Sequence, residues 1–193
     1  MGHIGEDVIL EDPAYVHETA LLYGKVAIKP GASIFAHVVM RAEAHEIVVG
    51  QRSNIQDFAM ISVGDFTPTL IGEDCSITTR VALRGCTIGN RCLIGIGATI
   101  LDGAKIGQNS IVAGHAMVDK NSIFEPNSII AGVPAKKIGE RDNSGVTRLN
   151  SSIYQIASEN YAAGAERFTD AQLQSIFDLA QANLSNQKTQ VQA

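Results

Sequence analysis

Aliphatic residues recur at every sixth position along most of the chain. This beat runs over residues 16–40, 49–61 and 71–118, with a slip of one residue after Leu83. Neither the 3.6-residue period of a helix nor the two-residue alternation of a strand produces such a spacing. A six-residue repeat is typical of a parallel β-helix, in which each unit forms one face of a prism and three units complete a turn. The pattern therefore predicts an all-β solenoid of about seven turns with a core of stacked aliphatic side chains. The residues expected to form this ladder are Val16, Leu22, Ile28, Ile34, Met40, Val49, Ile55, Ile61, Ile71, Ile77, Leu83, Ile88, Ile94, Ile100, Ile106, Val112 and Val118.

The pattern changes after the repeat. Pro134 has no N–H to donate to a strand ladder, and the lysines that follow it would protect an exposed sheet edge. Thr169 and Gln172 have the spacing of a capping box, which predicts a helix N-terminus there. The expected division of the chain is a β-helix, a linker, a pair of C-terminal helices and a flexible tail, over residues 1–138, 139–149, 150–184 and 185–193.

Composition narrows the classes of function. The 193 residues carry a net charge of −5 and 18 glycines, and only 5% of them are aromatic. No basic stripe accompanies this charge, so nucleic acid is not expected as a partner. No apolar run is long enough to span a membrane and no leader precedes the repeat, so a soluble, cytoplasmic protein is expected. Cys75, Cys86 and Cys92 have no CxxC spacing and are expected to be small buried residues rather than disulfides or zinc ligands.

Several segments inside the repeat resemble the γ-class carbonic anhydrase and carbonic-anhydrase-like family. The most specific are Asn-Ile-Gln-Asp at 54–57, Leu-Arg-Gly-Cys at 83–86 and Ala-Gly-Val-Pro-Ala-Lys at 131–136. This resemblance implies a left-handed β-helix that assembles as a homotrimer and ends in a C-terminal helix. Family members bind zinc or iron between subunits, with two histidines from one chain and one from the next.

On this resemblance, the three histidine positions are occupied by Ser62, Thr79 and Arg84. Serine and threonine hydroxyls are poor zinc ligands at neutral pH, and arginine stays protonated with no lone pair to offer a metal. Without a bound metal, water is not acidified to a hydroxide that could attack carbon dioxide. Zinc or iron is therefore not expected as a cofactor at this site, and neither is hydration of carbon dioxide.

Other residues of the family's pocket are present. Arg41 and Asp57 match an ion pair between subunits, and Glu43 replaces an aspartate of the same motif. Gln56 matches the residue that hydrogen-bonds the metal-bound solvent, and Tyr154 matches a tyrosine of the C-terminal helix.

Two interpretations of Arg84 stay open. It could neutralise Glu43 or Asp57 across a subunit interface and serve the assembly alone. It could also supply a fixed positive charge where the metal's charge would lie, next to Ser62 and Thr79, and so bind a small anion such as bicarbonate or a carboxylate.

Three functions follow from these observations. The first is a trimeric scaffold or small-anion binder without a metal, inactive in carbon dioxide hydration. The second is a hexapeptide-repeat acyltransferase that uses acyl-CoA, for which His115 is the candidate catalytic histidine, although no projecting loop accompanies it. The third is a carbonic anhydrase or thioesterase in which other histidines, such as His37 and His45, have rebuilt a metal site. The first function is the leading expectation, so enzymatic activity is not expected.

Overall fold

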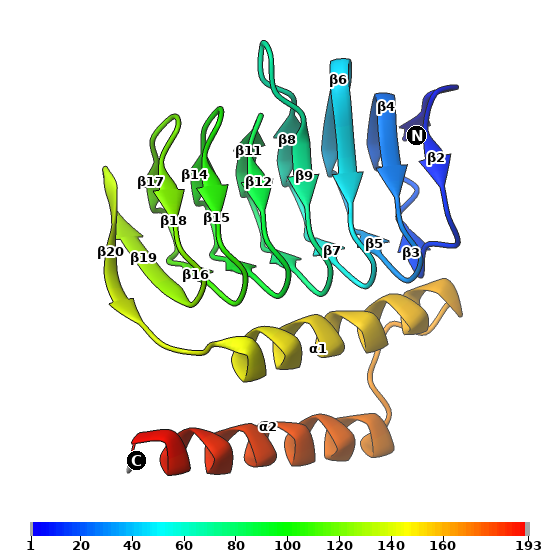
Figure 1. Ribbon diagram of the computed structural model, residues 1–193. Coiled ribbons are helices and arrows are strands. Elements are labelled where there is room, and N and C mark those ends of the chain that lie inside the picture. The colour runs from blue at the N-terminus through cyan, green and yellow to red at the C-terminus, as the bar shows by residue number, and fades with distance from the viewer. Residues whose placement is uncertain (1, 192–193) are drawn as a thin grey trace.

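The computed structural model describes residues 2–191, with side chains to residue 183. The repeat folds as a left-handed parallel β-helix of about seven turns, followed by two helices, α1 (Ser144–Ala162) and α2 (Asp170–Val191) (Figure 1). The prism has three faces, which determine where each candidate site residue lies.

Each face is a column of short parallel strands. Face 1 contains β8 (Met60–Ser62), β11 (Ala82–Arg84), β14 (Thr99–Ile100), β17 (Met117–Val118) and the first halves of β4 (Leu21–Ile28) and β6 (Val39–Val49). Face 2 contains the second halves of β4 and β6, then β9 (Thr69–Ile71), β12 (Thr87–Ile88), β15 (Lys105–Ile106) and β18 (Ile123–Phe124). Face 3 contains β3 (Tyr15–Val16), β5 (Ser33–Ile34), β7 (Asn54–Ile55), β10 (Ser76–Ile77), β13 (Leu93–Ile94), β16 (Ile111–Val112), β19 (Ser128–Gly132) and β20 (Ala135–Glu140). The N-terminal strands β1 (His3–Ile4) and β2 (Ile9–Leu10) pair with β4.

The predicted aliphatic ladder is the core of the prism. Each predicted ladder residue from Leu22 to Val118 is at most 3% exposed, and Val16 packs against them while partly buried. Parallel register stacks each of these side chains on its equivalent one turn away, as Ile77 stacks on Ile55 and Ile94. Full burial of such a side chain contributes roughly 1.5–3 kcal/mol, so the ladder dominates the stability of the prism. The three cysteines are free and buried, as predicted.

The last turn is closed by a reversal of the chain. After Pro134, β20 runs antiparallel to β19 and forms the edge of its sheet. Lys136 and Lys137 are exposed on this edge strand. Their charges protect the edge from pairing with other strands, as the sequence predicted.

The first helix begins at Ser144, not after the predicted linker at residues 139–149. Asn143 is buried, and its side-chain amide donates to the carbonyls of Asn109 (3.1 Å) and Arg141 (2.9 Å), which ties the helix start to the prism. The face of α1 that packs on the prism begins with small polar residues such as Thr147 and Ser151. These residues carry little hydrophobic signal, so the sequence pattern placed the helix start too late.

The second helix has the predicted capping box. The Thr169 N–H donates to the Gln172 side chain at 2.9 Å, and the Gln172 N–H donates to the Thr169 hydroxyl at 3.2 Å. The helix continues to residue 191, past its predicted end at residue 184 and into the segment predicted as a tail, while residues 192–193 lie outside the described residues. Figure 1 shows α1 between the prism and α2. Neither of these helices, within the described residues, is long and apolar enough to span a membrane.

Candidate functional site

Arg41, Ser62 and Arg84 lie side by side where face 1 meets face 2. Ser62 in β8 is in parallel register with Arg41 in β6 and with Arg84 in β11. Neighbouring strands are about 4.8 Å apart, so the Cα atoms of the two arginines stand roughly 10 Å apart with Ser62 between them. We call these three residues the arginine row. Register thus brings together two of the three predicted ligand positions and adds a second cation.

Arg84 is paired with two carboxylates of its own chain. Its Nε donates to both carboxylate oxygens of Asp102 at 3.1 Å, and its Nη2 donates to Asp65 at 2.7 Å. Lys120 lies 3.7 Å from Asp102 and joins the same cluster. Neither Asp65 nor Asp102 was among the predicted site residues. Asp102 could have been found, because it follows Arg84 by 18 residues, which is one turn of three six-residue units.

Arg41 also has a partner within the chain. Its Nε donates to Glu43 at 2.7 Å, and both side chains are more than half exposed on β6. This hydrogen bond lowers the pKa of the Glu43 carboxyl below its usual value. The predicted partner of Arg41 across an interface, Asp57, lies at a different corner of the prism, where face 3 meets face 1.

Thr79, Gln56 and Asp57 lie at this second corner. Thr79 is in the turn between β10 and β11, while Gln56 and Asp57 follow β7. Gln56 is buried, and its side-chain amide donates to Asn54 at 3.0 Å. Within a single chain, the predicted pocket residues therefore form two groups, which lie at opposite edges of face 1.

A groove opens beside Asp57, between the second corner and the end of α1. It has a volume of about 530 Å³ and is lined by Tyr15, His17, Phe35, Ala36, Asp57, Tyr161, Gly164, Ala165 and Glu166. We call it the aromatic groove. Tyr154 packs edge-on against Phe35 with ring centroids 5.5 Å apart. Burial, and then the charge of Asp57, raise the pKa of Tyr154. Tyr154 therefore packs against a residue that lines this groove, and its predicted pocket role stays a prediction.

His115, the candidate for acyl transfer, occupies a left-handed turn (φ 58°) further along the second corner. Its imidazole lies over Gly97, where an added Cβ would stand 2.7 Å from the ring. The absent side chain of Gly97 makes room for the imidazole, which is a packing role. The loop that projects from the prism lies instead between β8 and β9, on the side away from α1 (Figure 1).

The histidines are dispersed over the prism. His37 stacks on Phe58 with centroids 5.0 Å apart, and His45 Nε2 lies 3.3 Å from the carbonyl oxygen of Asp65. Over residues 2–191, the structure places no three histidine, cysteine, aspartate or glutamate side chains where they could hold a metal ion together. Ser62, Thr79 and Arg84 do not form a donor set that fits zinc or iron.

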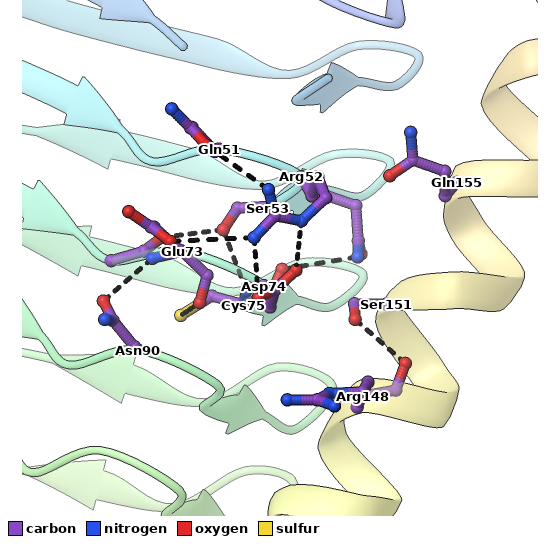
Figure 2. A network of polar contacts seen from close by, with 12 residues as sticks. Gln51, Arg52, Ser53, Glu73, Asp74, Cys75, Asn90, Arg148, Ser151 and Gln155 are labelled. Atoms are coloured by element: carbon purple, nitrogen blue, oxygen red, sulfur yellow. Dashed lines mark hydrogen bonds and ion pairs between the residues drawn. The ribbon is translucent and has the colours of Figure 1, made fainter. Parts of the chain in front are cut away.

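A second cleft lies between α1 and the third corner of the prism, where face 2 meets face 3. Arg52 donates to the two carboxylate oxygens of Asp74 at 2.7 and 3.0 Å and lies 3.6 Å from Glu73. Figure 2 shows this network, with Arg148 and Gln155 of α1 beside it. Both carboxylate oxygens of Asp74 hold its central arginine, Arg52, so we infer that this network stabilises the fold and does not bind a ligand.

Comparisons with known proteins agree with the fold and the repeat. A family model described as bacterial transferase hexapeptide (six repeats) matches residues 85–120. Protein YrdA of Escherichia coli is 34% identical over 142 residues, which cover 70% of this chain and 74% of that protein. Gamma carbonic anhydrase 1, mitochondrial, of Arabidopsis thaliana is 30% identical over 164 residues, or 82% of this chain, and the match spans only 60% of the plant protein.

A solved structure has the same architecture. The hexapeptide transferase family protein from Anaplasma phagocytophilum superimposes with a TM-score of 0.68 at 27% sequence identity, over 80% of this chain and 96% of that one.

Proposed function

This chain belongs to the γ-carbonic-anhydrase-like family of hexapeptide-repeat proteins, and we propose that it is a homotrimer that binds a small carboxylate or bicarbonate without a metal ion. The arginine row is the observation that carries this proposal. It provides two guanidinium groups on either side of the Ser62 hydroxyl, and two of its residues, Ser62 and Arg84, stand at positions where relatives are expected to bind their metal.

The arginines keep donors for a ligand even though both are paired. A guanidinium has five N–H donors in a planar fork. Arg41 uses Nε and Nη2 on Glu43, and Arg84 uses Nε and Nη2 on Asp102 and Asp65. The Nη1 groups make no hydrogen bond within the described residues, so they can donate to an anion that the Ser62 hydroxyl also contacts. Charge-assisted hydrogen bonds of this kind are stronger than hydrogen bonds between neutral groups.

The surface of face 1 supports a trimer. Val39, Met60, Ala82, Thr99 and Met117 point outward from it in register, and none of them is charged. This uncharged face has the arginine row along one edge and the carboxylate of Asp57 along the other. A head-to-tail contact that joins these two edges forms a ring when its rotation closes, and members of such hexapeptide families are commonly trimers.

The test is a calorimetric titration of the purified oligomer with acetate and with bicarbonate. We expect Arg84→Ala to weaken acetate binding by about tenfold or more, because it removes a charged donor. Arg84→Lys keeps the positive charge but loses the planar fork of donors, so its acetate affinity should lie between those of the parent and of Arg84→Ala. Arg52→Ala, which removes a paired arginine at the third corner, is the matched control and should leave binding unchanged.

The same preparations discriminate the alternatives. Metal content is measured, and acetate binding is repeated after chelation; loss of binding with the metal would overturn the proposal. Dissociation of Arg84→Ala into monomers would assign Arg84 to assembly instead. The resemblance to a hexapeptide transferase structure favours a second candidate, an acyltransferase. Saturable binding of acetyl-CoA that depends on His115 would support it.

A further inference from the structure

The aromatic groove has a continuous wall of rings. The ring centroids of Tyr15, Phe35 and Tyr161 are 5.8 to 6.1 Å apart in each pairing, with tilted or edge-on geometry. Phe35 is 4% exposed and forms the back of this cluster, whereas Tyr161 is 43% exposed at the groove. An aromatic face carries partial negative charge and attracts a cation that sits over it.

The groove also holds carboxylates that have no partner. Asp57 and Glu166 line it, and neither side chain forms a hydrogen bond or an ion pair within the described part of the chain. The paired carboxylates at the other two corners, Asp74 and Asp102, differ in this respect. Burial, the neighbouring Tyr161, and the charges of Glu18 and Asp57 together raise the pKa of Tyr15, so its phenol stays protonated and uncharged beside these carboxylates.

Among the residues that the structure describes, no lysine or arginine lines the groove to offset these charges. The basic side chain among its described lining residues is His17, whose Nδ1 lies 2.8 Å from the Thr19 hydroxyl. A volume of about 530 Å³ is within the range of small-molecule sites. The lining therefore combines room, ring faces and uncompensated negative charge.

We propose that the aromatic groove binds an organic cation, a quaternary ammonium group on a small molecule, over the face of Tyr161 and against Glu166 and Asp57. A quaternary ammonium has no N–H to donate, so it is recognised by ring faces and by nearby negative charge. Within one chain the groove lies at the opposite edge of face 1 from the arginine row, and cation binding does not need a bound carboxylate there. Asp57 can accept a hydrogen bond from an arginine of a neighbouring copy with one oxygen and still face the groove with the other.

The experiment uses choline and its neutral isostere 3,3-dimethylbutan-1-ol, titrated into the purified full-length oligomer and followed by NMR or calorimetry. The two probes have the same shape, and only choline carries the charge. We expect saturable choline binding and an affinity for the isostere about tenfold lower. Equal binding of both probes, or no binding of choline, would overturn the proposal; the latter would also result if a neighbouring copy filled the groove.

Variants of Tyr161 separate the ring face from the hydroxyl. Tyr161→Leu should weaken choline binding about fivefold or more, while Tyr161→Phe, which keeps the ring, should bind within about twofold of the parent. Glu166 is exposed, so Glu166→Gln is expected to fold and to weaken choline binding several-fold. Equal choline affinities of Tyr161→Leu and Tyr161→Phe would show that the aromatic ring does not contribute to binding. Acetate binding at the arginine row should be unchanged in all three, so failure here is distinguishable from failure of the proposed function.

Discussion

The two corners at the edges of face 1 differ in how their charged side chains are paired. The first corner is where face 1 meets face 2, and the second is where face 3 meets face 1. At the first corner, Arg41 and Arg84 are matched by carboxylates of their own chain, and Asp102 reaches Arg84 from one turn away. At the second corner, Asp57 has no cationic partner within the described residues and stands beside aromatic rings, and Glu166, from the segment between α1 and α2, lines the same groove. Both corners belong to the same repeating backbone. The side chains that the neighbouring turn places in register decide which corner keeps spare donors and which keeps spare negative charge.

Reversal of one charge at each corner should have the largest effect. If the corners of neighbouring copies meet in the proposed trimer, Arg41→Glu or Asp57→Arg alone places like charges together and should dissociate it. Close charge pairs across interfaces couple by about 1.5–7 kcal/mol. The double variant restores opposite charges and should restore assembly. Sedimentation of all four proteins at matched concentration measures this, and single variants that stay trimeric would show that these edges do not meet.

A methyl group at Gly97 should have a smaller effect, confined to the second corner. Gly97 has φ 68°, and an added Cβ would stand 2.7 Å from the His115 ring. We expect Gly97→Ala to lower the free energy of unfolding by about 2 kcal/mol, from backbone strain and crowding together. Urea unfolding measures the loss. Removal of the ring in Gly97→Ala/His115→Ala should recover the crowding part, and no recovery would mean that the backbone conformation accounts for the whole cost.

The smallest effect is expected at the third corner. Arg52 is paired as completely as Arg84, but its network faces α1 (Figure 2). Because the Arg52 side chain is 45% exposed, solvent screens its ion pairs, and Arg52→Ala should cost only about 0.5–1 kcal/mol in urea unfolding. Assembly and acetate affinity should not change. If acetate affinity fell as far as in Arg84→Ala, the arginine row would have no special role.

Local patterns in the sequence predicted the elements whose causes are local. The ladder was predictable because each sixth residue must face the inside of a narrow prism, whatever lies in the other turns. The capping box of Thr169 and Gln172 was predictable because its two hydrogen bonds span only three residues. The start of α1 was not, because it depends on a contact between Asn143 and Asn109, which are 34 residues apart.

The candidate site divides in the same manner. The sequence by itself determined the aliphatic core, the family resemblance, and the presence of Ser62, Thr79 and Arg84 at positions where relatives are expected to carry histidines. Only the tertiary structure decided that Arg84 pairs with Asp65 and Asp102, and that Tyr15, Phe35 and Tyr161 meet beside Asp57. Charges and rings act over a few ångströms. Their partners are set by the register between turns and by the path of α1 over the prism, and the chain brings such distant segments together only when it folds.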